Sequence, residues 1–142
     1  SGPEYYLTDM IALAVQQNKG VAATATEDAD ECLGAGTRAE MVAVEKAFRR
    51  RTNNRWLAQG VTIVDPDSTY IDPDVTIGQD TVVWPNSYLQ GKTAVGQDCV
   101  IGPNTILRDT AVGDNCRIEQ AVLEGVDLAA GTVVEPFSVI RN

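Results

Sequence analysis

The sequence contains no histidine among its 142 residues. Histidine is the side chain that most often acts as a general base near neutral pH, and it is a common ligand of zinc. Its absence excludes a Ser–His or Cys–His nucleophile pair and a His-ligated zinc within this chain. Catalysis by these residues would have to use carboxylates, lysine, tyrosine or backbone groups.

Cysteine is also scarce, with three residues and no CxxC spacing among Cys32, Cys99 and Cys116. A sparse, odd count is typical of reduced thiols and predicts a cytoplasmic protein without a disulfide scaffold. No apolar run approaches the roughly 20 residues that a membrane-spanning helix needs. No basic-then-apolar signal opens the chain either. We therefore expect no membrane partner.

Positive charge is the third shortage, because 11 Lys and Arg face 20 Asp and Glu, for a net charge of −9. An acidic surface repels nucleic acids and anionic membranes, so we expect neither as a partner. Hydrophobic residues make up 44% of the sequence, which is enough for a folded core. The length suits one domain, or two small pieces joined.

The first sixty residues predict helices around a short strand. Thr8 is predicted to cap a short helix, and Gly20 suits the position after its last turn. The buried stripe of this helix would consist of Ile11, Leu13, Ala14 and Val15. Residues 21–25 (VAATA) predict a buried strand, and the acidic residues 27–31 predict a solvated loop.

A second helix is signalled by Thr37 and Glu40, which match a capping box, and Gly60 can end it. Its apolar stripe is predicted to contain Met41, Val44, Ala47, Phe48, Trp56 and Leu57. Arg49–Arg51 with Arg55 could form an anion site, but we favour charges on a solvated face near the helix C-terminus. Residues 34–36 (GAG) lack the lysine of a phosphate loop and predict a turn.

From residue 71 onward the sequence repeats every six residues, as in residues 77–82 (IGQDTV) and 95–100 (VGQDCV). Each repeat begins with an aliphatic residue and has a small residue four positions later. The repeats that begin at Leu107, Ile118 and Leu123 are shortened to five residues. A hexapeptide period is the signature of a parallel β-helix, whereas an amphipathic antiparallel sheet alternates strictly in twos.

Stacking of the repeats predicts which residues become neighbours. Every third repeat lies on the same side of a triangular coil, with members about 4.8 Å apart. The three interior columns are Ile71/Leu89/Leu107/Leu123/Ile140, Ile77/Val95/Val112/Leu128 and Val83/Ile101/Ile118/Val134. Cys99 and Cys116 share a column of small positions. We expect buried thiols there, because in-register parallel neighbours present poor disulfide geometry.

Glycine, proline and aromatic residues recur at set places in the repeats. Glycine directly follows the aliphatic residue at Gly78, Gly96, Gly102 and Gly113, which we interpret as a need for unusual backbone angles. Proline at Pro85, Pro103 and Pro136 predicts fixed-φ corners. Tyr70, Trp84 and Tyr88 point outward from the first coils and could anchor the helical segment or a neighbouring copy.

Three segments in this order resemble one enzyme family: residues 4–9 (EYYLTD), residues 33–38 (LGAGTR) opening a helix, and repeats ending in residues 135–141 (EPFSVIR). It is the bifunctional N-acetylglucosamine-1-phosphate uridylyltransferase/glucosamine-1-phosphate N-acetyltransferase family, which completes UDP-N-acetylglucosamine synthesis. The resemblance covers essentially the whole chain, as the middle portion of such an enzyme. It implies a left-handed β-helix, against the usual crossover rule, and a homotrimer formed through that helix.

The resemblance also implies Mg²⁺, acetyl-CoA, a nucleotide and a sugar phosphate as ligands of the intact family. Only Arg141 falls on a family binding residue, an arginine that contacts the phosphorylated sugar; an ordinary surface arginine is the alternative. The family's magnesium-binding Asn is Gly36 here, which offers no side-chain ligand. The family's Gly-rich nucleotide loop and catalytic histidine match no residues of this chain. We therefore predict no catalytic residue, metal site or cofactor for this chain.

We predict a mainly β fold, a left-handed parallel β-helix over residues 61–142, preceded by a short α/β helical segment over residues 1–60 that is the remnant of a nucleotidyltransferase domain. Two functions compete: a portion of a sugar-nucleotide biosynthetic enzyme that is inactive alone, or a structural trimerisation module, which Gly36 favours. The lack of histidine disfavours a stand-alone hexapeptide acyltransferase or a carbonic-anhydrase-like enzyme. A Gly-rich nucleotide loop upstream in the parent gene would favour the first function, and its absence the second.

Overall fold

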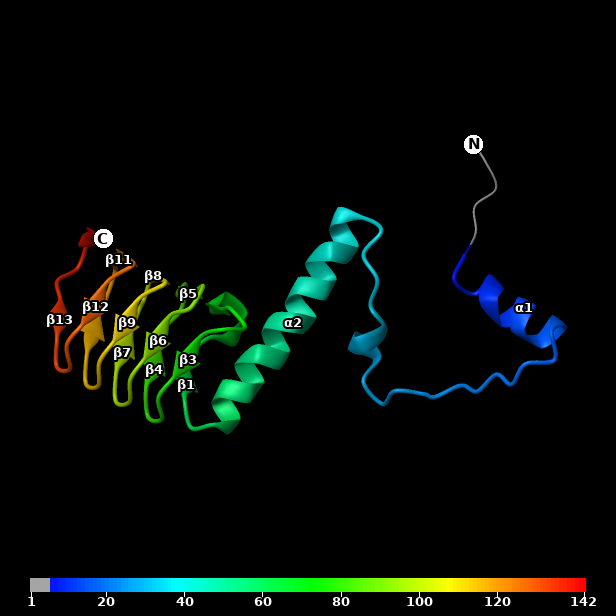
Figure 1. Cartoon of the computed structure of the whole chain (residues 1–142). Helices are drawn as coiled ribbons and strands as arrows, with labels where there is room; N and C mark the ends of the chain where they lie inside the picture. The colour runs from blue at the N-terminus through cyan, green and yellow to red at the C-terminus, as the bar shows by residue number, and fades with distance from the viewer. Residues whose placement is uncertain (1–5) are drawn as a thin grey trace. The chain divides into compact units, whose positions relative to one another are not determined.

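The computed structural model describes residues 6–142, so Glu4 and Tyr5 of the EYYLTD segment lie outside the described residues. The chain forms two compact units, Ser1–Leu33 and Gly34–Asn142. Figure 1 shows the helices and the stack of strands that follows the longest helix. The predicted domain boundary between residues 60 and 61 stays a prediction.

The first unit contains helix α1 (Asp9–Gln16) and the 3₁₀ helix η1 (Ala29–Cys32). Thr8 stands at the N-cap of α1, but its side chain makes no capping hydrogen bond, so that part of the prediction is wrong. The reason is that Thr8 already has helical dihedrals, φ −63° and ψ −23°, whereas a capping residue is extended. Instead, the amide of Tyr6 donates to Asp9 Oδ2 at 2.9 Å.

Two further predictions for this unit are wrong. The stripe of α1 is not buried, because Ile11, Leu13 and Val15 are exposed and Ala14 is half-buried. A two-turn helix buries a stripe only against another element, and α1 has no buried residue. Residues 21–25 form no strand. An isolated apolar run does not become a strand without a neighbour to hydrogen-bond. The acidic residues 27–31 are exposed or half-buried, as predicted for a solvated loop, and lead into η1.

The second unit begins with helix α2 (Arg38–Ala58), whose capping box is confirmed. Thr37 Oγ1 accepts from the amide of Glu40 at 3.2 Å, and Glu40 Oε2 accepts from the amide of Thr37 at 2.9 Å. Gly60, with φ +87°, follows the last turn as predicted.

Only part of the apolar stripe predicted for α2 is buried. Trp56 is buried and Val44 and Ala47 are half-buried, but Met41, Phe48 and Leu57 are exposed. The buried face consists instead of Arg49, Thr52, Asn53 and Trp56, in the C-terminal half of the helix. That half contacts the first coil, and Asn53 Nδ2 donates to the carbonyls of Pro66 at 2.9 Å and Thr69 at 3.1 Å.

Fourteen short strands and a 3₁₀ turn, η2 (Pro66–Ser68), form the rest of the unit. Sheet A contains β1 (Thr62–Ile63), β4 (Val82–Val83), β7 (Val100–Ile101), β10 (Arg117–Ile118) and β13 (Val133–Val134). Sheet B contains β2 (Tyr70–Ile71), β5 (Tyr88–Gln90), β8 (Ile106–Arg108), β11 (Val122–Glu124) and β14 (Val139–Arg141). Sheet C contains β3 (Thr76–Ile77), β6 (Ala94–Val95), β9 (Ala111–Val112) and β12 (Asp127–Leu128). Successive strands belong to successive sheets, so the chain winds as a parallel β-helix.

The register of the three predicted columns is confirmed, but Ile140, in the last strand, is 37% exposed and not interior. Leu89 pairs with Leu107 in sheet B, Val95 with Val112 in sheet C, and Ile101 with Ile118 in sheet A. The interior members of the central coils are the most completely buried residues, and Leu89, Leu107, Ile101, Ile118 and Leu123 are all 0% exposed. The column in sheet A starts one coil earlier than predicted, because Ile63 pairs with Val83.

The prediction that the repeated glycines are needed for unusual backbone angles is wrong at three of the four positions. Gly102 has φ +91°, but Gly78, Gly96 and Gly113 are absent from the left-handed region. Positive φ falls two residues after each of these three glycines, at Asp80, Asp98 and Asn115. These positions need glycine because the backbone of the next coil lies too close for a side chain. A Cβ on Gly96 would lie 2.7 Å from the amide nitrogen of Asp114 on the next coil.

Hydroxyl groups line the inside of the corners, as the small-residue positions predicted. Thr81, Ser87, Thr93 and Thr105 are each 0% exposed. Thr81 Oγ1 donates to the carbonyl of Gly96 at 2.8 Å, and Ser87 Oγ to that of Trp84 at 2.7 Å. Carbonyls that turn inward at a corner would otherwise be buried without a donor, at a cost of about 1–3 kcal/mol each.

The glycine contact yields a stability prediction. Gly96→Ala should lower the free energy of unfolding by about 1–3 kcal/mol, because its methyl group meets backbone atoms of the next coil, which cannot move aside. Urea unfolding followed by circular dichroism measures the change. Gly34→Ala is the matched control, since nothing lies within 4 Å of its added Cβ. Equal stability of the two variants would contradict the steric explanation.

Candidate functional site

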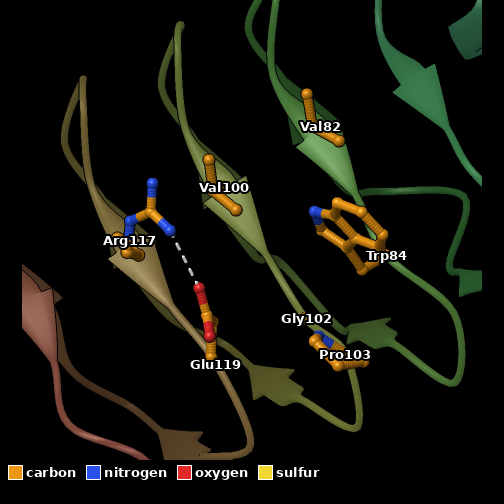
Figure 2. A pocket seen from close by; sticks show the side chains of 7 residues that line it. All are labelled: Val82, Trp84, Val100, Gly102, Pro103, Arg117 and Glu119. Atoms are coloured by element: carbon orange, nitrogen blue, oxygen red, sulfur yellow. Dashed lines mark hydrogen bonds and ion pairs between the residues drawn. The ribbon is translucent and has the colours of Figure 1, made fainter.

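A groove lies on the outer face of sheet A, and the alternation of strand residues creates it. Val83, Ile101 and Ile118 point inward, so the residues on either side of each point outward. The lining residues are Val82, Trp84, Val100, Gly102, Pro103, Arg117 and Glu119 (Figure 2). The groove has a volume of about 410 Å³. Gly102 is buried and its φ is +91°, and a Cβ added there would meet Ser87 Oγ and the carbonyl of Trp84.

The groove is apolar at its centre and carries one ion pair at its end. Arg117 Nη1 lies 3.0 Å from Glu119 Oε1, as the dashed line in Figure 2 shows. The two charges compensate, so the groove is close to neutral in a chain of net charge −9. Such a surface suits an apolar side chain with a polar tip. It offers no nucleophile beside a base.

Arg141, the predicted sugar-phosphate contact, lies on sheet B and away from this groove. It follows Ile140 in β14 and its side chain is 66% exposed. Its Nε lies 3.6 Å from Glu124 Oε2, and Glu124 Oε1 lies 3.4 Å from Arg108 Nη1. Arg108 in turn donates to Gln90 Oε1 at 3.0 Å. Arg141 is thus the last member of a polar ladder on sheet B, and its binding role stays a prediction.

The turn at residues 34–36 uses its amides internally. The amides of Gly36 and Thr37 both donate to Glu40 Oε2, at 2.8 and 2.9 Å. These are the groups that a phosphate would need at a helix N-terminus. Gly36 offers no side-chain oxygen, so the residues present do not fit a magnesium ion at this position. Across residues 6–142 no group of three or more metal-ligating side chains is found.

The arginines of α2 divide between two environments. Arg50, Arg51 and Arg55 are exposed, as predicted for a solvated face. Arg49 is not: it is 9% exposed, and its guanidinium lies 4.5 Å from the ring centroid of Tyr70. It was expected on the solvated face because helix spacing alone does not show which side the first coil covers.

One of the outward aromatics, Tyr70, contacts helix α2, which is one of the two predicted roles. The rings of Tyr70 and Tyr88 stack at a centroid distance of 4.7 Å, and Arg49 covers the Tyr70 ring. Trp84 lies in the groove on sheet A and is 43% exposed. Sequence reasoning found Trp84 but missed the groove. The sequence did contain a signal for the groove, because Val82 and Val100 are aliphatic residues at outward positions of their strands.

The cysteines are free, as predicted. Cys99 and Cys116 are each 1% exposed, and their thiols contact the carbonyls of Gly113 and Ala129 at 3.2 Å. Burial raises the pKa of the Cys99 thiol. A buried thiol with a raised pKa is a poor nucleophile, so Cys99 acts as a packing group.

Comparison with known proteins agrees with the fold. Residues 74–109 match the family model described as bacterial transferase hexapeptide (six repeats). Over 97% of the chain, the sequence is 39% identical to the protein named Bifunctional protein GlmU from Halalkalibacterium halodurans and 40% identical to that from Pelobacter propionicus. The chain spans about 30% of the length of these relatives. The resemblance found in the sequence is confirmed. In residues 6–142, no helix is long and apolar enough to cross a membrane.

The capping box yields a pH prediction. Hydrogen bonds from the amides of Gly36 and Thr37 lower the pKa of Glu40 below its usual value. A lowered folded-state pKa stabilises the helix above the unfolded-state pKa, and this is lost as the pH falls through the folded-state pKa. Helical circular dichroism should therefore decrease on acidification in the wild type. Glu40→Gln should remove this component, and an unchanged acid profile would contradict it.

Proposed function

We propose that this chain, a homologue of the proteins named Bifunctional protein GlmU, is a trimerising and spacing portion of a sugar-nucleotide biosynthetic enzyme. The observation that carries the proposal is the similarity itself, which runs through helical segment and repeats alike over 97% of the chain. The pathway would be UDP-N-acetylglucosamine synthesis in the cytoplasm. Uridylyl and acetyl transfer, with Mg²⁺ and acetyl-CoA, would belong to the intact enzyme.

The chemistry of the described residues supports a part without catalysis of its own. The groove on sheet A combines apolar side chains with one compensated ion pair. Gly36 replaces a magnesium ligand, and the sequence has no histidine for proton transfer. Burial raises the pKa of the Cys99 thiol, which makes it a poor nucleophile. None of these arrangements places a nucleophile within reach of a base.

A spacing role is supported by the joint between α2 and the first coil. Asn53 is 0% exposed and donates to two carbonyls of the first coil. Arg49 stacks on Tyr70 one turn earlier. These contacts make α2 and the coils one body. A helix of 21 residues at about 1.5 Å per residue extends some 30 Å, and this length is the spacing that we propose it provides.

A homotrimer is supported by the surface of the β-helix. The flat outer faces of a solenoid are either exposed to solvent or covered by a binding partner. Here several outward side chains are apolar and exposed, including Trp84 at 43%, Tyr88 at 36% and Val133 at 61%. Exposed apolar side chains on flat outer faces favour association with a partner, because association removes them from water.

In the intact enzyme, Arg141 would contact the phosphorylated sugar. Its guanidinium is 66% exposed and is held beside Glu124 at 3.6 Å, a distance that allows exchange for a phosphate. A second candidate, a structural module without any enzymatic parent, is favoured by Gly36 alone. The parent gene separates the two, because only the enzyme requires a Gly-rich nucleotide loop upstream.

The first test is activity. The isolated chain should form no product from UTP and N-acetylglucosamine-1-phosphate, and none from acetyl-CoA and glucosamine-1-phosphate, above a control without protein. The reason is that it lacks a histidine and a magnesium ligand at Gly36. Coupled assays of pyrophosphate and of free CoA measure the two reactions. Product above the control in either assay would overturn the non-catalytic part of the proposal.

The second test is mass in solution. Sedimentation equilibrium at micromolar concentration should give about three times the chain mass of 15.2 kDa, because the apolar outer faces are removed from water on association. A single species of one chain mass at the same concentration would show that the chain does not trimerise by itself.

A further inference from the structure

The polar ladder on sheet B has one member from each of four successive coils. The strand register pairs Gln90 with Arg108, Arg108 with Glu124, and Glu124 with Arg141. Parallel strands lie about 4.8 Å apart, so each side chain can reach the next member of the ladder. The order of the charges is neutral, positive, negative and positive. Glu124 therefore lies between two arginines.

The carboxylate of Glu124 is shared loosely between these arginines. Its Oε1 lies 3.4 Å from Arg108 Nη1, and its Oε2 lies 3.6 Å from Arg141 Nε. Close hydrogen bonds between a guanidinium and a carboxylate are about 2.7–2.9 Å long, so both contacts are long. All three side chains are at least 40% exposed, and an exposed ion pair changes an equilibrium by no more than about fivefold. A ligand of Arg141 therefore has only a weak pair to break.

Gln90 orients Arg108 from the other side of the ladder. Gln90 Oε1 accepts from Arg108 Nη2 at 3.0 Å, which is shorter than either contact of Glu124. Because Nη2 is directed at Gln90, the other terminal nitrogen, Nη1, is directed at Glu124. Arg108 is thus placed to hold the Glu124 carboxylate even when Arg141 has another partner.

A second arginine–glutamate pair, on sheet A, shows why this matters. Arg117 Nη1 donates to Glu119 Oε1 at 3.0 Å, and the pair consists of one cation and one anion. If another anion took Arg117, Glu119 would lose this partner and stay close to the new negative charge. The same exchange at Arg141 leaves Glu124 beside Arg108, so the carboxylate stays compensated. Of the two arginines, Arg141 is the one at which an exchange of anions costs less.

The anion that suits Arg141 is a phosphate monoester. A guanidinium presents a planar fork of N–H donors that matches the spacing of phosphate oxygens. A phosphate monoester carries a charge of about −1.5 to −2 near neutral pH, so it attracts Arg141 more strongly than the single charge of Glu124 does. The same charge repels Glu124 and favours its contact with Arg108.

We propose that Glu124 competes with a phosphate monoester for Arg141, and that Arg108 keeps the Glu124 carboxylate paired when the phosphate binds. The inference rests on the proposed binding role of Arg141 and deepens it by naming the residues that set the affinity. Because the phosphate must displace an anion that is already present, its affinity is lower than the two arginines alone would give. Glu124 regulates the affinity of this site and takes no part in bond making.

Substitutions of the two neighbours of Arg141 in sign and sequence test the proposal. The full chain is titrated with glucosamine-1-phosphate at constant ionic strength, and the NMR signal of the Arg141 Nε–H group, assigned by its loss in Arg141→Lys, gives the affinity. Glu124→Gln should tighten binding by about two- to fivefold, because it removes the competing charge and keeps the side-chain size. Arg108→Gln should weaken binding by about the same factor, because Glu124 then pairs with Arg141 alone.

The double variant tests that Arg108 acts through Glu124. In the Glu124→Gln background, Arg108→Gln should change the affinity by less than about 1.5-fold, because Arg108 lies two strand spacings from Arg141, roughly 10 Å, where salt screens exposed charges. An equal loss of affinity in both backgrounds would show that Arg108 attracts the phosphate directly, and would contradict the proposal.

Glu119→Gln is the matched control. It removes a carboxylate from the side of Arg117 on sheet A, with the same change in net charge as Glu124→Gln. The affinity measured at Arg141 should not change. A gain as large as that of Glu124→Gln would attribute the effect to overall charge and overturn the proposal. Circular dichroism checks that each variant is folded.

Inorganic phosphate is the second probe, because it carries the same group without the sugar. Glu124→Gln should tighten the binding of both probes. A gain with glucosamine-1-phosphate alone would show that Glu124 acts on the sugar, and would rule out competition for the phosphate.

The outcomes separate this inference from the role of Arg141 itself. Weaker binding by Glu124→Gln would make Glu124 a positioning residue, and unchanged binding would make it a bystander. Either result overturns the competition and leaves Arg141 as the phosphate contact. If the Arg141 signal responds to neither probe, in the wild type and in Glu124→Gln alike, the inference and the binding role of Arg141 both fail.

Discussion

The close backbone-to-backbone stacking of successive coils is the constraint on which the rest of this structure depends. The amide of Val82 donates to the carbonyl of Cys99 at 2.8 Å, and the amide of Val100 donates to that of Cys116 at 2.9 Å. These parallel ladders hold the coils about 4.8 Å apart. Interior side chains must therefore stack in columns of similar size, and a residue facing the next coil at Gly96 must lack a Cβ. Carbonyls that leave the ladders at the corners need donors, which Thr81 and Ser87 supply.

Because packed side chains fill the interior, the groups that a partner or ligand could contact lie on the outer faces. Sheet A carries a near-neutral groove around Trp84, and sheet B carries the ladder that ends in Arg141. The strand alternation that buries Val83 is the same alternation that exposes Trp84, so core and surface are specified together along each strand.

The interior columns were predictable because a six-residue period leaves one arrangement in which aliphatic residues stack. The capping box at Thr37 was predictable because it is a local interaction between residues three apart. The burial of Arg49 was not, since α2 has a mixed surface and only the first coil shows which side is covered. The stripe of α1 failed for the same reason: apolar spacing predicts which residues can be buried together, and a partner is needed to bury them. The groove on sheet A required neighbouring coils to bring Val82, Val100 and Arg117 side by side.

The sequence by itself determined the winding of the chain, the members of each column, the free state of Cys99 and Cys116, and the relationship to the bifunctional enzymes. These properties depend on the period of the sequence and on interactions between residues close along the chain, and both can be read without knowing the fold. The tertiary structure decided why Gly78 and Gly96 are glycines, where Arg49 is buried, and which outward residues form a common surface. These depend on distances between residues about 17 or 18 apart along the chain, such as Gly96 and Gly113 or Tyr88 and Ile106. Only the stacking of coils brings such residues into contact.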